Sequence, residues 1–166
     1  AVVSSDLARA RETADLIASA CPSAQRTVDA GLREICFGEC QGRLQHEVHH
    51  VRSEVAASWR RGNFGAHVAG GESADELMTR GIRSLRAAAE LGRNVVVVSH
   101  GGLIKWCATR IELGDEAPSP KSMSQPKIAQ VLQAPVVNCC CSFLVYDHMA
   151  QRFSSDDWFV SLDSNK

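Results

Sequence analysis

The chain has 166 residues, of which 45% are hydrophobic, and a formal net charge of −1 at pH 7. This length suits one hydrophobic core, so we expect a single domain over residues 1–166. The near-zero charge creates no field that would attract nucleic acid or an anionic membrane, and we expect neither as a partner. The sequence shows no bilayer-length apolar run and no signal-peptide pattern.

The cysteines indicate a reducing compartment. There are seven, an odd number, without the spacing of a disulfide framework or a zinc site, and Cys139, Cys140 and Cys141 are adjacent. We expect them to act as small packing residues in a cytoplasmic protein.

The first third of the chain alternates strand and helix signals. Residues 1–4 predict a short buried strand, and Ser5 or Asp6 is expected to cap a helix that ends at Cys21-Pro22. Its apolar positions are Leu7, Ala10, Ala14 and Ile17. Residues 28–32 predict a short strand or extended segment, and a loop follows at Phe37–Gly42.

Two further helices are expected before the middle of the chain. Apolar residues recur at helical spacing over residues 44–59. After a glycine-rich connection, Ser73 and Glu76 form a capping-box pattern that starts a helix ending near Gly92.

Residues 94–105 hold the strongest signal. Four consecutive valines predict a strand buried on both faces, and a helix follows the turn Ser99-His100-Gly101-Gly102. In α/β proteins, ligands bind at the carboxyl ends of parallel strands next to helix N-termini, and His100 and Gly101 are placed there. A hydrogen-bonded turn histidine is the alternative for His100.

The last part of the chain is expected to be richer in strands. Residues 114–126 contain three prolines and predict a long irregular loop, and strands are expected over 131–137, 139–147 and 153–162. The whole pattern predicts a mostly parallel sheet covered by helices, with an antiparallel edge.

Two more residues could carry chemistry. Arg9 lies in the first turns of a helix that follows a strand, where its guanidinium could bind a phosphate, although a solvated surface arginine is the better interpretation from local pattern alone. Glu34 lies between apolar residues, and a carboxyl group in an apolar pocket can serve as a general acid; an exposed edge-strand glutamate fits equally well.

Other candidates favour structural roles or are rejected. Glu72 precedes a helix and is expected to be a cap partner, and His46, His49 and His50 are expected on a solvated helix face without a metal. Cys21 and Arg26 are too close for a cysteine-phosphatase loop, and the sequence has no nucleotide-binding glycine motif or serine-hydrolase elbow.

Four blocks together resemble the histidine phosphatase superfamily, the phosphoglycerate-mutase-like group. They occur in the family's order and are Ser5-Asp-Leu-Ala-Arg-Ala-Arg-Glu-Thr-Ala14, Leu32-Arg-Glu-Ile-Cys-Phe-Gly38, Gly70-Gly-Glu-Ser73 and Val98-Ser-His-Gly-Gly102. The resemblance covers most of the chain from Val2 to about Asp147. It implies a three-layer α/β/α sandwich with a mostly parallel sheet.

The resemblance also implies an activity. In the family a first histidine attacks phosphorus, and water hydrolyses the resulting phosphohistidine; no metal or other cofactor is required. By position, Arg9 and Gly101 would bind the phosphate, Glu34 would donate the proton to the leaving group, and His100 would bind the phosphoryl oxygens. The implied partner is a small phosphorylated metabolite.

The family's hallmark, a first strand ending in Arg-His-Gly, is absent from this sequence. We therefore expect a truncated form of a phosphatase, with an unfilled place in the sheet and little or no activity of its own. The alternatives are a non-catalytic phosphate-binding or scaffold protein and, less favoured because the connections are short, a mutase.

Overall fold

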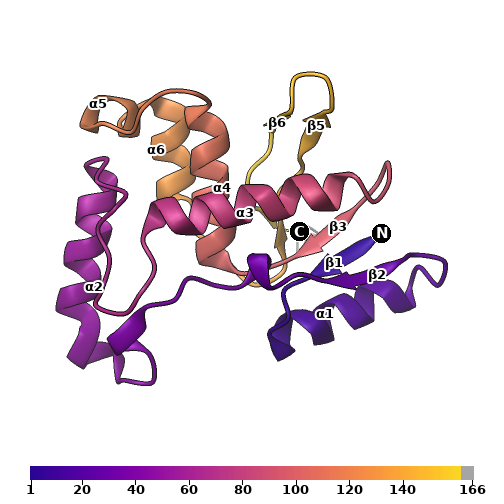
Figure 1. The fold of residues 1–166 in the computed structure, drawn as a ribbon, viewed down its shortest axis with the longest axis horizontal. Coiled ribbons are helices and arrows are strands. Elements are labelled where there is room, and N and C mark those ends of the chain that lie inside the picture. The colour runs from indigo at the N-terminus through magenta and orange to yellow at the C-terminus, as the bar shows by residue number, and fades with distance from the viewer. Residues whose placement is uncertain (162–166) are drawn as a thin grey trace.

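The computed structural model describes residues 1–161, and Figure 1 shows a small parallel sheet near α1 and α3, with α2, α5 and α6 on the side away from the sheet. The helices are α1 (Ala8–Ser19), α2 (Gln45–Arg60), α3 (Ala74–Ala89), α4 (Gly101–Leu113), α5 (Pro120–Met123) and α6 (Pro126–Gln133), with 3₁₀ turns at Ala30–Leu32 and Gly38–Cys40. The strands are β1 (Val2–Ser4), β2 (Arg26–Val28), β3 (Val96–Val98), β4 (Cys140–Cys141), β5 (Val145–Asp147), β6 (Arg152–Ser154) and β7 (Val160–Ser161).

The parallel sheet has the strand order β2-β1-β3. Val2 of β1 pairs with Arg26 on one side and Val96 on the other, and Ser4 pairs with Val28 and Val98. Because the three strands run in the same direction, their carboxyl ends form one edge. The residues after β1 and β3 therefore emerge side by side.

Helices cover both faces of this sheet, which makes three layers. Ala14 and Ala18 of α1 pack with Val2 and Val98 on one face. Leu77 of α3 and Leu103 of α4 belong to the cluster that receives Val3, Val95 and Val97 from the other face. Side chains alternate between the two faces along each strand, so each strand contacts helices on both sides. The predicted three-layer α/β/α sandwich is confirmed.

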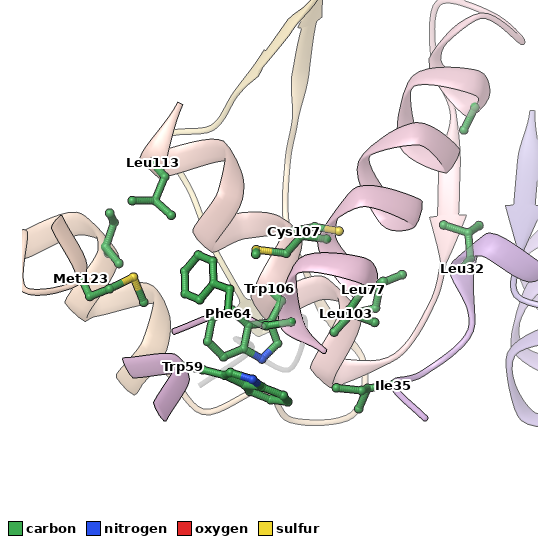
Figure 2. Close-up of a cluster of buried hydrophobic side chains, with 14 of the residues drawn as sticks. Leu32, Ile35, Trp59, Phe64, Leu77, Leu103, Trp106, Cys107, Leu113 and Met123 are labelled. Atoms are coloured by element: carbon green, nitrogen blue, oxygen red, sulfur yellow. The ribbon is translucent and has the colours of Figure 1, made fainter. Parts of the chain in front are cut away.

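A larger core lies beyond the sheet and holds the helices together (Figure 2). Trp106 of α4 meets the edges of two aromatic rings, with centroid distances of 5.2 Å to Trp59 of α2 and 5.6 Å to Phe64. The Trp59 indole N–H donates to the carbonyl of Ala66 at 2.6 Å. The aromatic side chains thus fix α2 and the following loop against α4.

The predicted middle helices are confirmed as α2, α3 and α4. Ser73 is the N-cap of α3, where its hydroxyl accepts from the Glu76 amide at 3.2 Å and the Glu76 carboxylate accepts from the Ser73 amide at 2.9 Å. The predicted cap of α1 is wrong, because the N-cap is Leu7. The side chains of Ser5 and Asp6 bind His100 and Arg33 instead.

Two predicted segments have a different structure. Residues 131–137 do not form a strand: α6 begins at Pro126, whose fixed backbone angle suits a first helical turn, and buries Ile128 and Val131 on one side. The segment predicted at 28–32 divides into the end of β2 and the 3₁₀ turn Ala30–Leu32.

The strand predictions after residue 94 need a larger correction. β3 is not buried on both faces, because Val96 is 44% exposed and within residues 1–161 no strand pairs with the outer side of β3. The later strands do not extend the parallel sheet but form two short antiparallel ladders, β4 with β7 and β5 with β6. Leu162, the last residue of the predicted final strand, lies outside the described residues.

In the part of the chain that the structure describes, no helix is long and apolar enough to cross a membrane.

Candidate functional site

His100 lies at the carboxyl edge of the parallel sheet. It is the N-cap of α4 in extended conformation, directly after β3, and only 7% of it is exposed. Its Nε2 lies 2.9 Å from the hydroxyl oxygen of Ser5, which is fully buried after β1. The parallel pairing of β1 with β3 brings these two residues together across 95 positions of sequence.

Charged groups surround the His100 ring. Burial lowers the pKa of His100 from its ordinary value of 6.5, the positive charge of Arg9 lowers it further, and the carboxylate of Glu34 opposes this. The lowered pKa favours the neutral imidazole near pH 7. The charges of Arg9 and Glu34 thus both act on the His100 imidazole.

Glu34 lies across the start of α4. Its carboxylate accepts from the amides of Gly102 at 3.0 Å and Leu103 at 3.1 Å, and from its neighbour Ile35 at 3.0 Å. The expected apolar pocket around Glu34 is therefore wrong. The carboxylate satisfies helix amides that have no partner within the helix, and its charge suits the positive end of the helix dipole.

Gly102 is required for this contact. A Cβ atom at position 102 would lie 2.4 Å from Oε1 of Glu34, closer than such atoms approach in proteins. At Gly101 the nearest atom to a Cβ would be Cγ1 of Val136 at 3.3 Å. Of the first four α4 amides, those of Gly102 and Leu103 donate to Glu34 and that of Ile104 donates to the His100 carbonyl. Among residues 1–161, only the Gly101 amide of these four has no acceptor.

Arg9 is the cation of the site that is free to bind a ligand. It is exposed on the first turn of α1, and within residues 1–161 its guanidinium makes no hydrogen bond or ion pair. Arg33 instead donates two hydrogen bonds to Asp6, at 2.6 and 2.7 Å, which lowers the pKa of that carboxyl group.

Arg80 of α3 holds the backbone that carries Glu34. Its guanidinium forms a two-pronged ion pair with Glu72, with N–O distances of 2.6 and 2.9 Å. It also donates to the carbonyls of Gly31 and Arg33 at 2.8 Å and of Glu34 at 3.3 Å. The prediction that Glu72 is the cap partner of α3 is therefore wrong: Glu76 supplies the cap, and Glu72 pairs with Arg80.

A shallow depression of about 370 Å³ lies on the outer side of this segment. Arg33, Glu34, Cys36, Glu72 and Arg80 are among its lining residues, but Arg9 and His100 are not. Both lining arginines are paired with carboxylates, so the depression offers an anion little uncompensated positive charge. The side of Glu34 that faces Arg9 and His100 is better suited to phosphate.

Within residues 1–161, no three His, Cys, Asp or Glu side chains are arranged to hold a metal ion. His46, His49 and His50 lie exposed on α2, away from Glu34 and His100. The residues that could meet a ligand are therefore a free arginine, a neutral histidine, a carboxylate and one helix amide.

Sequence reasoning missed Ser5 and Arg80. Ser5 is the first residue of the block Ser5–Ala14. Parallel pairing of the strands predicted before Ser5 and before His100 would have placed the two residues side by side. Arg80 has no comparable signal, because eight residues separate it from Glu72 and its carbonyl partners lie 46 to 49 residues away. These contacts can be identified only from the three-dimensional structure, in which α3 packs against the segment that carries Glu34.

The fold and the site define an α/β protein in which His100 and Glu34 meet at the start of α4, at the carboxyl edge of a parallel sheet. The family model described as histidine phosphatase superfamily (branch 1) matches residues 1–155. The chain belongs to this superfamily, as its four sequence blocks predicted.

Curated relatives and solved structures agree with this membership. The chain is 36% identical over 107 residues to phosphoglycerate mutase-like protein 4 of Arabidopsis thaliana, covering 63% of this chain and 46% of that protein. It is 35% identical over 131 residues to the probable phosphoglycerate mutase GpmB of Citrobacter koseri, covering 68% and 58%. The chain therefore spans about half the length of the curated relatives it matches.

The solved structures show the same fold. A mycobacterial glucosyl-3-phosphoglycerate phosphatase superposes with a TM-score of 0.70 at 24% identity, covering 96% of this chain and 77% of that chain. The alpha-ribazole phosphatase from Shigella flexneri gives a TM-score of 0.66 at 20% identity, covering 95% and 72%.

Proposed function

We propose that this chain forms part of a phosphatase that hydrolyses a phosphomonoester of a small metabolite through a phosphohistidine intermediate. The nucleophilic histidine comes from a segment outside these 166 residues. The observation that carries the proposal is the exposed Arg9, whose guanidinium has no hydrogen-bond or ion-pair partner within residues 1–161 and whose charge acts on the buried His100 at the start of α4. A solved neighbour, the mycobacterial phosphatase, is also described in complex with inorganic phosphate.

Each residue has a defined part in the first step. The external histidine nitrogen attacks phosphorus while the bond from phosphorus to the ester oxygen breaks. Arg9, His100 and the Gly101 amide hold the phosphoryl oxygens and stabilise the charge that they carry in the transition state. Glu34 gives a proton to the departing oxygen, so the product leaves as an alcohol.

The second step reverses the proton transfer. Water attacks the phosphohistidine, the phosphorus–nitrogen bond breaks, and Glu34 takes up the proton from the water. Glu34 then returns to its starting protonation state, and inorganic phosphate is released. Because α4 amides bind both carboxylate oxygens of Glu34, the proton donor keeps a fixed position through the cycle.

The test compares this chain with the longer protein that is read from its upstream coding sequence, using an aryl phosphate as substrate. We expect turnover and an acid-labile phosphoenzyme from the longer protein, and only background from the 166-residue chain. Arg9→Met should lower kcat/KM about 100-fold or more, whereas Arg11→Met on the exposed surface of the same helix should leave it unchanged.

Two results would contradict the proposal. Turnover by the 166-residue chain that His100→Ala abolishes would place the nucleophile inside this chain. Phosphate binding without turnover by the longer protein would favour the non-catalytic alternative. Transfer of the phosphoryl group to a second hydroxyl of the substrate, in place of release to water, would indicate the mutase activity that the names of the curated relatives suggest.

A further inference from the structure

The hydrogen bond between Ser5 and His100 lies in the interior of the protein. Ser5 is 0% exposed, and its hydroxyl oxygen lies 2.9 Å from Nε2 of His100. The same oxygen accepts from the amide of Leu7 at 3.3 Å. Within residues 1–161 these are the two partners of the Ser5 hydroxyl group, and together they determine which group donates to the other.

The Ser5 hydroxyl group is the donor of this bond. A hydroxyl group carries one proton and can accept two hydrogen bonds. If Nε2 of His100 donated to Ser5, the hydroxyl proton would be buried without an acceptor among residues 1–161, which is unfavourable. If Ser5 donates to Nε2, its proton and its oxygen both have a partner. Nε2 is then an acceptor and carries no proton.

The neutral His100 ring therefore carries its proton on Nδ1. In the described part of the chain, Oγ1 of Thr27 is the one buried side-chain nitrogen or oxygen without a hydrogen-bond partner. Nδ1 of His100 also has no partner there, so it is not among the buried atoms and reaches the molecular surface. The Glu34 carboxylate does not take this proton, because it accepts from the amides of Ile35 and of α4.

We propose that Ser5 holds the neutral His100 imidazole in the tautomer with its proton on Nδ1, and that this N–H donates to an oxygen of the bound phosphoryl group. Ser5 is thus a positioning residue, which determines the place of the proton and the orientation of the ring without touching the ligand. The ligand contact rests on the proposed function, whereas the tautomer follows from the contacts of Ser5 and His100 alone.

A hydroxyl group beside a histidine is also the arrangement of a serine nucleophile and its general base. Two features of Ser5 exclude that role. Its side chain is fully buried, so a substrate phosphorus atom cannot approach it, and its oxygen already accepts from the Leu7 amide. The hydroxyl group therefore acts on the ring and not on a substrate.

The position of the proton matters because phosphoryl oxygens are negatively charged. A ring protonated on Nε2 would present the Nδ1 lone pair to such an oxygen, whereas a proton on Nδ1 makes the neutral ring a donor. Burial and the charges of Arg9 and Arg80 lower the pKa of His100. The carboxylates of Glu34 and Asp6 act in the opposite direction. The Nδ1 tautomer lets His100 bind an anion while it stays uncharged.

Nuclear magnetic resonance of the 166-residue chain with isotope-labelled histidine tests the tautomer directly. Long-range proton–nitrogen spectra at about pH 8, where the ring is neutral, distinguish a protonated from an unprotonated ring nitrogen. We expect the proton of His100 on Nδ1, and His100→Gln assigns the signal. A proton on Nε2 in the unchanged chain would overturn the proposal, whatever the variants show.

Variants of Ser5 test whether this residue sets the tautomer. Ser5→Ala removes the donor, so more of the His100 ring should carry its proton on Nε2, the form that is favoured in water. Ser5→Thr keeps a hydroxyl group and should keep the proton on Nδ1. The matched control is Ser4→Ala, since Ser4 is also buried but its side chain makes no hydrogen bond within residues 1–161. A tautomer that Ser5→Ala leaves unchanged would remove Ser5 from this role.

The ligand contact is probed with sulfate, a tetrahedral dianion whose charge stays constant near neutral pH. Sulfate should shift the Nδ1 signal of His100 more than the Nε2 signal. In the longer protein, Ser5→Ala should lower kcat/KM for an aryl phosphate about tenfold at neutral pH. This loss should shrink as the pH falls, because the imidazolium ion carries a proton on both nitrogens. A general structural defect would persist at every pH.

These readouts separate the inference from the proposed function. A proton on Nδ1 that depends on Ser5, in a longer protein that hydrolyses no phosphate ester, would keep the tautomer and reject the phosphatase. A sulfate response at Nε2 and not at Nδ1, or a kcat/KM loss in Ser5→Ala that is the same at all pH values, would contradict the ligand contact.

Discussion

Single residues at the start of α4 determine the geometry of the site. Gly102 leaves room for the Glu34 carboxylate, and that carboxylate takes the place at the helix N-terminus that the sequence suggested for a ligand anion. In the proposed function, the phosphate would therefore bind towards Gly101, His100 and Arg9. The turn that the sequence predicts to approach a ligand thus binds a carboxylate of the protein itself.

Gly102→Ala should destabilise the protein by about 2 kcal/mol, although alanine is normally the better helix residue. The added methyl group displaces the Glu34 carboxylate and leaves α4 amides without their acceptor. Urea unfolding measures the effect, and Gly101→Ala, whose methyl group has more room, is the control. Equal stability of both variants would show that Glu34 does not depend on Gly102.

The protonation of His100 should make stability depend on pH. Because the pKa of His100 is lowered in the folded protein, the unfolded chain takes up the proton first as the pH falls below 6.5. The free energy of unfolding should then decrease as the pH falls below about 6.5. Above pH 6.5, His100 should contribute no pH dependence. Urea unfolding between pH 5 and 8 should show a shallower acid-side decline for His100→Gln than for the unchanged chain.

Among the elements, α3 does the most to position the site. Arg80 on α3 binds Glu72 at the start of the helix and three carbonyls of the segment that carries Glu34. This one side chain ties a loop without regular structure to a rigid helix. The position of Glu34 therefore depends on the docking of α3 as well as on its contacts with α4.

Arg80→Met should lower the free energy of unfolding by about 2 kcal/mol, because the half-buried Glu72 carboxylate then loses both hydrogen bonds from the guanidinium. The matched change Arg83→Met, on an exposed position of the same helix, should have little effect. Thermal or urea unfolding of the two variants provides the measurement. A double variant Glu72→Gln, Arg80→Met should recover part of the loss, since it removes the uncompensated charge.

Elements with a local signal could be predicted, and elements defined by distant contacts could not. The capping box of Ser73 and Glu76 and the valine run before His100 each mark their element within a few residues, and both are present in the structure. The apolar residues of segment 131–137 predict a strand, but Pro126 starts a helix that continues to Gln133. The environment of Glu34 was wrong for a different reason: its partners Gly102 and Leu103 lie 68 and 69 residues away.

The stability of the whole molecule depends on the aromatic core as much as on the parallel sheet. Trp59, Phe64 and Trp106 connect α2, the following loop and α4, while the parallel sheet contributes only three short strands. Burial of these large rings supplies much of the stability that such a small sheet cannot. The α4 helix that carries the site residues also carries Trp106, so core and site are parts of one rigid element.

Trp106→Ala should destabilise the whole protein by about 3–5 kcal/mol through the cavity it leaves. Trp158→Ala, at a half-buried position, should cost clearly less. Circular dichroism during urea unfolding would measure both, and the loss of far-UV signal in the Trp106 variant should remain a single transition. An equal loss of unfolding free energy in the two variants would contradict the claim that Trp106 stabilises the core more than Trp158 does.

The hydrogen bond between Ser5 and His100 also has a consequence for the folding kinetics. It joins residues 95 positions apart, and the contacts of Glu34 with α4 span nearly 70. Closing loops of this length is slow compared with forming the helices between them. On a ribosome, Ser5 would leave the exit tunnel long before its partner is synthesised. The edge of β1 that pairs with β3 then stays open, although β2 can already pair with the other edge. The site would be among the last parts of the molecule to form, and delays in synthesis would prolong the exposure of β1.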